Sequence, residues 1–202
     1  MKNIFLSAGV PAASDQPYGQ TADPMLIYSA VRSLCRLVFG HKHLIWGGQP
    51  AITPMMWAAC ENLGVNYAQA VRLYQSRYFP QEQYPEENKR FANVTYIDAA
   101  ADLPSSLLSM RKRMFTDHVY EAGIFIGGKN GIEDEYDLFV QYQPNAKAIV
   151  LAATGGGALS IAQNHTGPDI AAQNMVDFFS YLANRIEIDL PTIPVVSDQP
   201  PP

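Results

Sequence analysis

The feature that most limits the fold is a repeated order of short apolar runs, each followed by a turn and a helical segment. The runs are nearly all apolar, as strands covered on both faces require. They span residues 3–10, 43–46, 70–75, 94–97, 123–126 and 147–152. Strands that alternate with helices through short connections predict an α/β fold. We expect a Rossmann-like, three-layer arrangement in which helices cover both faces of a mostly parallel sheet.

The helical segments are marked by apolar residues at helical spacing and by capping residues. We expect helices over residues 24–39, 53–63, 105–121, 133–142, 158–163 and 169–185. Asp23 and Pro24 suit the N-cap and first position of the first helix. Residues 79–92 carry prolines and charges and predict an exposed loop. The prolines after residue 190 predict an extended tail, so the domain is expected to cover residues 1–188 and a tail or linker residues 189–202.

Small residues follow four of the predicted strands, where open parallel sheets bind ligands. Glycine lets a ligand approach the backbone, and the next helix adds unpaired N–H groups that favour phosphate. The predicted ligand-binding residues of these ends are Ser7, Ala8, Gly9, Gly47, Gly48, Gln49, Pro50, Gly127, Gly128, Lys129, Asn130, Gly131, Thr154 and Gly155, with Thr53 and Ser76 close by. The alternative is that the glycines serve only the geometry of tight turns.

Two common nucleotide motifs are missing from the chain. Gly128 and Lys129 are followed by Asn130, where a Walker motif has Ser or Thr. No G-x-G-x-x-G pattern follows the first predicted strand. A P-loop NTPase and an ordinary Rossmann dehydrogenase are therefore disfavoured.

Three charged residues near the predicted strand ends are candidates for chemistry. Arg111 stands beside the apolar stripe of its helix, so its guanidinium is placed to reach a pocket. Lys112 is included with it, although a solvated helix face is the better explanation for Lys112 alone. Glu135 lies in the predicted helix after Gly131, where a carboxylate complements the helix dipole or, beside a phosphate site, holds a ribose or acts as an acid or base.

Composition excludes several other classes. The net charge is −5 with no basic block, so a duplex nucleic-acid binder is disfavoured. Cys35 and Cys60 lie in apolar helical stretches and make neither a disulfide framework nor a thiolate metal site. His41 and His43 have no further ligand at metal spacing. No apolar run is long enough for a membrane span or a signal peptide, so we expect a cytoplasmic protein.

The helix and glycine-rich segments together resemble the SLOG superfamily, named for the Smf/DprA and Lonely Guy proteins, over about residues 3–160. Enzymes of the Lonely Guy type have an Arg-Lys pair in a helix, then a strand, then Pro-Gly-Gly-x-Gly-Thr-x-x-Glu. Here residues 110–114 are Met-Arg-Lys-Arg-Met, and residues 126–135 are Ile-Gly-Gly-Lys-Asn-Gly-Ile-Glu-Asp-Glu. The chain differs from that motif in Ile126, in Ile132 and in one extra residue within the loop.

Residues 46–54, Trp-Gly-Gly-Gln-Pro-Ala-Ile-Thr-Pro, are similar to a SLOG subgroup of prokaryotic conflict systems that is associated with TIR domains. The resemblance implies a homo-oligomeric sensor of an anti-phage defence system. It would bind a nucleotide signal derived from NAD or ADP-ribose, without a metal or another cofactor, and would have a TIR-domain protein as partner. Backbone at the glycine pairs and Gly131 would face the phosphate, Arg111 and Lys129 would pair with its charge, and Glu135 would hold a ribose.

Two alternatives remain at this point. The first is a nucleoside 5′-monophosphate phosphoribohydrolase like the Lonely Guy enzymes, in which Arg111 and Glu135 are the candidate catalytic residues. The second is a scaffold whose pocket has lost its ligand.

Overall fold

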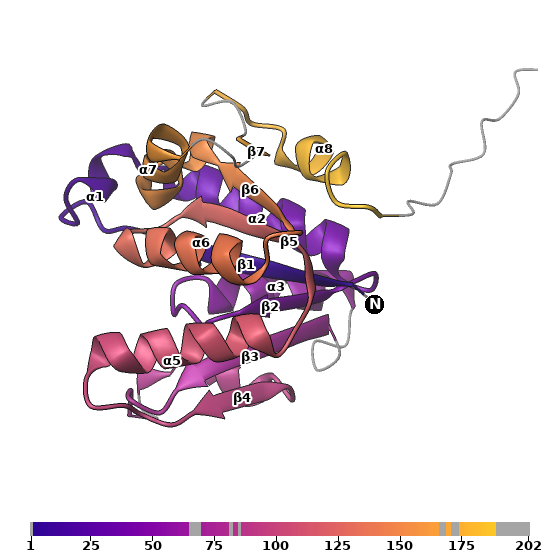
Figure 1. Cartoon of the computed structure of the whole chain (residues 1–202). Coiled ribbons are helices and arrows are strands. Elements are labelled where there is room, and N and C mark those ends of the chain that lie inside the picture. The colour runs from indigo at the N-terminus through magenta and orange to yellow at the C-terminus, as the bar shows by residue number, and fades with distance from the viewer. Residues whose placement is uncertain are drawn as a thin grey trace, which may run out of the picture.

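A seven-stranded parallel sheet forms the centre of the molecule, with the strand order β4-β3-β2-β1-β5-β6-β7 (Figure 1). The computed structural model describes residues 2–64, 70–80, 83–84, 86–165, 169–170 and 174–188. The strands are β1 (Asn3–Gly9), β2 (His43–Trp46), β3 (Val71–Ser76), β4 (Val94–Ile97), β5 (Tyr120–Gly127), β6 (Lys147–Leu151) and β7 (Asp169–Ile170). The α/β fold with a parallel sheet is therefore confirmed. The predicted tail, residues 189–202, lies outside the described residues.

Helices cover both faces of this sheet and bury two apolar clusters against it. On one face α2 (Pro24–Val38), α3 (Thr53–Leu63) and α8 (Phe178–Ala183) pack against Ile4 and Leu6 of β1. On the other, α5 (Leu103–Thr116), α6 (Asn130–Tyr142) and α7 (Gly156–Asn164) pack against Phe5. Successive side chains of a strand point to opposite faces, so one strand contributes to both clusters.

Capping residues set several helix limits. The Asp23 side chain accepts hydrogen bonds from the backbone N–H groups of Met25 and Leu26 and begins α2. Gly64 ends α3 in a left-handed conformation with φ of 62°, which glycine adopts at little cost. Both boundaries follow the sequence prediction.

Three predicted segments were wrong in extent. The helix expected over residues 105–121 ends at Thr116, because Tyr120 and Glu121 join β5 beside β1. The helix expected over 169–185 is replaced by β7, which pairs with β6, and by the short helix α8. The loop over 79–92 contains the 3-10 helix η2 (Glu86–Arg90) and the buried Phe91. A short helix, α1 (Tyr18–Thr21), was not predicted.

Both cysteines are buried, and each is a free thiol. Burial raises the pKa of the Cys35 thiol well above its usual range and that of Cys60 to about 12. Both belong to the apolar cluster under α2 and α3. They therefore serve as small core residues, as predicted.

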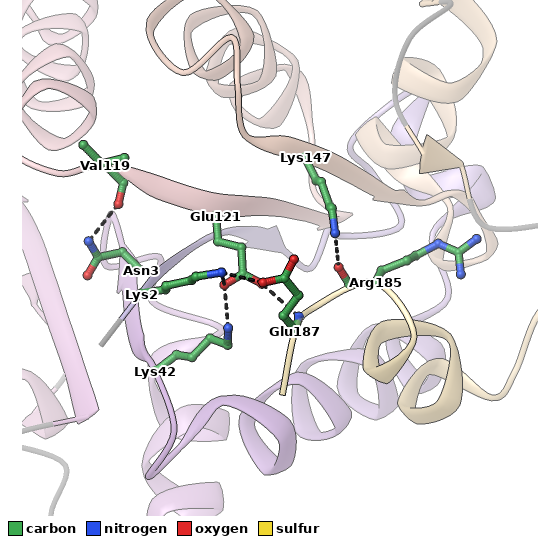
Figure 2. Close-up of polar contacts among 8 residues, drawn as sticks. All are labelled: Lys2, Asn3, Lys42, Val119, Glu121, Lys147, Arg185 and Glu187. Carbon is green, nitrogen blue, oxygen red and sulfur yellow. Dashed lines mark hydrogen bonds and ion pairs between the residues drawn. The ribbon is translucent and has the colours of Figure 1, made fainter. Parts of the chain in front are cut away.

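Ion pairs join the amino ends of three neighbouring strands to the segment after α8 (Figure 2). Lys42, just before β2, contacts Glu121 of β5 with 2.5 Å between Nζ and Oε2, and both side chains are buried. The other oxygen of Glu121 accepts the backbone N–H of Glu187 at 2.9 Å. Lys2 forms an exposed ion pair with Glu187. This amino-edge network lies at the opposite end of the strands from the predicted ligand site.

Within the described ranges, no helix combines the length and the hydropathy that crossing a bilayer demands.

Candidate functional site

A cavity of about 410 Å³ opens at the carboxyl ends of β1, β2, β3 and β5, beside α5 and α6. Fourteen of the predicted ligand residues line it. They are Ser7, Ala8, Gly9, Gly47, Gly48, Gln49, Pro50, Ser76, Arg111, Gly128, Lys129, Asn130, Gly131 and Glu135. Segments far apart in the sequence thus meet at one rim, as parallel strands require.

Close backbone contacts join the loops of this rim. The Gly128 N–H donates to the Gly9 carbonyl at 2.8 Å, so the ends of β1 and β5 touch. A Cβ atom added at Gly9 would lie 3.1 Å from the Gly128 Cα, tighter than ordinary van der Waals contact. One added at Gly47 would lie 3.2 Å from the Met110 methyl group and 4.0 Å from the Glu135 carboxylate. Larger residues at these glycines would intrude on the cavity.

A carboxylate is fixed in the cavity by two donors. The Ser7 hydroxyl donates to Oε2 of Glu135 at 2.5 Å, and Nε of Arg111 donates to Oε1 at 3.2 Å. Only 17% of the Glu135 side chain and 10% of the Arg111 side chain are exposed to solvent. Hydrogen bonds to both oxygens restrict the rotation of the carboxylate, so it presents a defined acceptor to a ligand hydroxyl.

Arg111 is already neutralised by its neighbours. Besides Glu135, its Nη1 atom donates to Asp134 at 3.0 Å and its Nη2 atom to the Gly131 carbonyl at 3.1 Å. Three sides of the guanidinium therefore fasten α5 to the first two turns of α6. In this arrangement Arg111 positions the start of α6 and the Glu135 carboxylate, and it does not present an unpaired charge.

The amino end of α6 faces the cavity without a side-chain cap. The backbone N–H groups of Asn130 and Gly131 donate to no acceptor within the described part of the chain. Unpaired first-turn amides and the helix dipole together attract anions. Lys129, beside them, is paired with Asp15 at 3.3 Å and is half exposed. Within the cavity, this helix end is therefore the feature best suited to an anion.

Five predicted ligand residues lie away from the cavity. Thr53 is buried, and its hydroxyl donates to the Gln49 carbonyl at 3.2 Å, whereas Lys112 is exposed on α5. Gly127, Thr154 and Gly155 lie behind the glycine-rich loops that line the cavity. The Gly127 N–H donates to the Thr154 hydroxyl at 2.8 Å, and that hydroxyl donates to the Leu151 carbonyl at 2.6 Å. The N–H groups of Gly127 and Gly128 are thus already engaged in the structure.

Eleven further residues that line the cavity were not predicted from the sequence. These lining residues are Leu6, Val10, Pro11, Trp46, Gln75, Phe79, Gln83, Tyr84, Leu107, Met110 and Ile132. The aromatic and amide side chains between residues 79 and 84 were a usable signal, because they interrupt a segment otherwise rich in proline and charge. Their place in the cavity depends on how the segment after β3 folds back.

Among the described residues, no three His, Cys, Asp or Glu side chains are grouped so as to hold a metal ion.

Comparison with known proteins gives one family and one related fold. The sequence model of the SLOG cluster3 family matches residues 17–186. The X-ray structure of TM1055, a Northeast Structural Genomics Consortium target, is similar with a TM-score of 0.56 and 13% sequence identity. The match covers 92% of this chain and 100% of that chain. No curated protein matches the sequence significantly.

Proposed function

Because the chain belongs to the SLOG cluster3 family, we propose that it binds a nucleotide in the cavity at the carboxyl edge of the sheet. Family and fold both support a nucleotide-related function. The observation that carries the proposal is the amino end of α6, which has no side-chain cap and whose first residues, Asn130 and Gly131, line the cavity together with the fixed Glu135 carboxylate. Donors for a phosphate and an acceptor for a ribose hydroxyl thus lie within one cavity.

The proposed binding mode differs in one respect from the roles that the resemblance implies. The ligand phosphate accepts from the N–H groups of Asn130 and Gly131, with Lys129 as the adjacent cation. A ribose hydroxyl donates to Glu135. Arg111 acts as a positioning residue, because each of its three side-chain nitrogens already donates one hydrogen bond, to Glu135, Asp134 or the Gly131 carbonyl.

The ligand that we propose is a signal derived from NAD or ADP-ribose, sensed within an anti-phage defence system. The cavity volume of about 410 Å³ supports a ligand much larger than a lone phosphate. A TIR-domain protein as partner, assembly into a homo-oligomer and a cytoplasmic location are further parts of this proposal. They follow by analogy with the SLOG subgroup to which residues 46–54 are similar.

A second candidate function is hydrolysis of a nucleoside monophosphate at its N-glycosidic bond. The immobilised Glu135 favours it, because a carboxylate fixed beside the ribose could stabilise positive charge that develops on the sugar. The extra residue in the loop before α6 argues against hydrolysis, because a displacement of a catalytic group by about 1 Å can reduce the reaction rate roughly 100-fold. Binding tolerates such a change better than catalysis, so we favour the sensor.

The first test removes one backbone donor. Asn130 is the first residue of α6, where proline is tolerated, and the preceding Lys129 is extended, as a residue before proline must be. We expect Asn130→Pro to weaken binding of ADP-ribose or AMP about 10-fold or more, the effect of losing a hydrogen bond to a charged group. Isothermal titration calorimetry measures this. Asn130→Ala keeps the N–H and is expected to bind within about threefold of the wild type. Equal affinity of the proline variant would contradict phosphate binding at this helix end.

The second test separates sensing from hydrolysis. We expect no free base to accumulate when the protein is incubated with nucleoside 5′-monophosphates, ADP-ribose or NAD and the products are separated by chromatography. Base release that disappears in Glu135→Gln, a variant that keeps the side-chain size, would establish the hydrolase instead. Base release that persists in this variant would point to a contaminating activity.

A further inference from the structure

The charged side chains of the cavity, Arg111, Lys129 and Glu135, gather at one end of it. Ser7 ends β1, and Gly131 and Glu135 lie in the first turns of α6, which follows β5. The opposite end is formed by Gln75 and Ser76 at the carboxyl end of β3 and by Phe79, Gln83 and Tyr84 after it. In the sheet order, β2 and β1 separate β3 from β5. Three strand spacings amount to about 14 Å, so the cavity is longer than a sugar phosphate needs.

Two aromatic side chains, Phe79 and Tyr84, line the β3 end of the cavity. We name this pair the aromatic wall. Both are half-buried, and the Tyr84 hydroxyl donates to the Ser76 carbonyl at 2.7 Å. That bond occupies the polar end of Tyr84 and fixes its ring. The Phe79 ring is in edge contact with Tyr78, with 5.8 Å between ring centroids. The rings therefore offer the ligand apolar, π-bearing surface that is fixed in advance.

Apolar side chains of α5 also line the cavity. Leu107 and Met110 are three residues apart in α5 and share one of its faces. Methionine packs favourably against aromatic rings because its thioether is polarisable. The cavity thus combines an anion-binding end with an end suited to a flat aromatic group.

From this arrangement we propose that the aromatic wall is the base subsite, so that the cavity selects nucleotides over sugar phosphates by stacking on the heterocyclic base. The inference rests on the proposed function and adds the orientation of the ligand, with its phosphate at α6 and its base at Phe79 and Tyr84. Stacking on an aromatic side chain depends little on base identity, because every base has a π-face. Gln75 and Gln83 lie in the same lining; the Gln75 amide is buried and donates to the Gly48 carbonyl at 3.4 Å, whereas Gln83 is exposed.

The test compares ligands that differ only by the base. Calorimetry is carried out with ribose 5-phosphate and with the four ribonucleoside 5′-monophosphates, and the tightest-binding nucleotide is used further. Phe79→Ala and Tyr84→Ala are each expected to weaken nucleotide binding about 10-fold. Their affinity for ribose 5-phosphate should stay within about twofold of the wild type, because that ligand does not reach the wall.

The matched control is Tyr28→Ala. Tyr28 is equally aromatic, but it lies in α2, is exposed and does not line the cavity. Its nucleotide affinity should equal that of the wild type. The base subsite would be overturned if the Phe79→Ala and Tyr84→Ala variants lost affinity equally for nucleotide and ribose 5-phosphate, or lost affinity for neither. Either result would leave the proposed function unaffected. Failure of the wild type to bind any of these probes would overturn both.

Discussion

Replacing Glu121 by alanine is expected to lower the free energy of unfolding by about 3–5 kcal/mol. The Glu121 carboxylate contacts the ammonium of Lys42, and both side chains are less than a tenth exposed. Without Glu121 the ammonium of Lys42 remains buried with its closest counter-charge removed. The backbone N–H of Glu187 also loses its acceptor (Figure 2). Urea unfolding measures the change in the free energy of unfolding. An m-value equal to that of the wild type would show that the same surface is exposed on unfolding.

Two controls separate the contribution of this buried ion pair to stability from that of the neighbouring contacts. Lys2→Ala removes the exposed ion pair with Glu187 and a longer contact of 3.8 Å with Glu121, and we expect an unfolding midpoint close to that of the wild type. The double variant Lys42→Met with Glu121→Leu replaces the pair by apolar groups and should recover most of the lost stability. If Glu121→Ala stays within about 1 kcal/mol of the wild type, the pair is not the determinant that its burial indicates.

Replacing Gly155 by alanine is expected to cost about 3 kcal/mol or more. Gly155 has φ of 70° and ψ of −158°, a region that is essentially reserved for glycine. An added Cβ would lie 1.9 Å from the Thr21 carbonyl oxygen, so the segment after α1 would have to move away. The hydrogen bond from the Gly156 N–H to the Thr21 hydroxyl lies at the same contact and would be disturbed. Thermal and urea unfolding both report the loss.

Gly64→Ala is the matched control for this substitution. Gly64 also has a positive φ, but nothing lies within 4 Å of its added Cβ, so only the left-handed conformation is penalised. That penalty is about 1–2 kcal/mol. A Gly155 variant no less stable than the Gly64 variant would refute the close packing of α1 against α7. Gly155, predicted as a ligand residue, therefore has a role in packing in the structure.

Much of the architecture could be predicted from local sequence. Apolar runs identified six of the seven strands, and Gly64 and Asp23 marked helix limits, because these signals depend only on neighbouring residues. The strand β7 was missed because two residues carry no periodicity and form a strand only beside β6. The start of β5 was placed in a helix because Tyr120 and Glu121 continue a helical pattern until pairing with β1 decides otherwise.

The location of the cavity at the carboxyl edge of the sheet could also be predicted from the sequence. Parallel strands bring their carboxyl ends to one edge, so glycine-rich segments 80 residues apart had to approach one another. The electrostatic state of that edge was not predictable. Whether Arg111 offers a free charge depends on Asp134 and Glu135, and this is decided by the packing of α5 against α6.

The sequence by itself thus determined the α/β class, the order of most elements and the sheet edge at which the predicted site residues gather around a cavity, because periodicity and glycine placement are local properties. Only the tertiary structure decided that Arg111 is neutralised, that Gly127 and Gly155 pack behind the glycine-rich rim and not in the cavity, and that Phe79 and Tyr84 line the cavity. Each of these outcomes depends on contacts between segments distant in sequence. Such contacts are set by side-chain shape and burial across the whole fold.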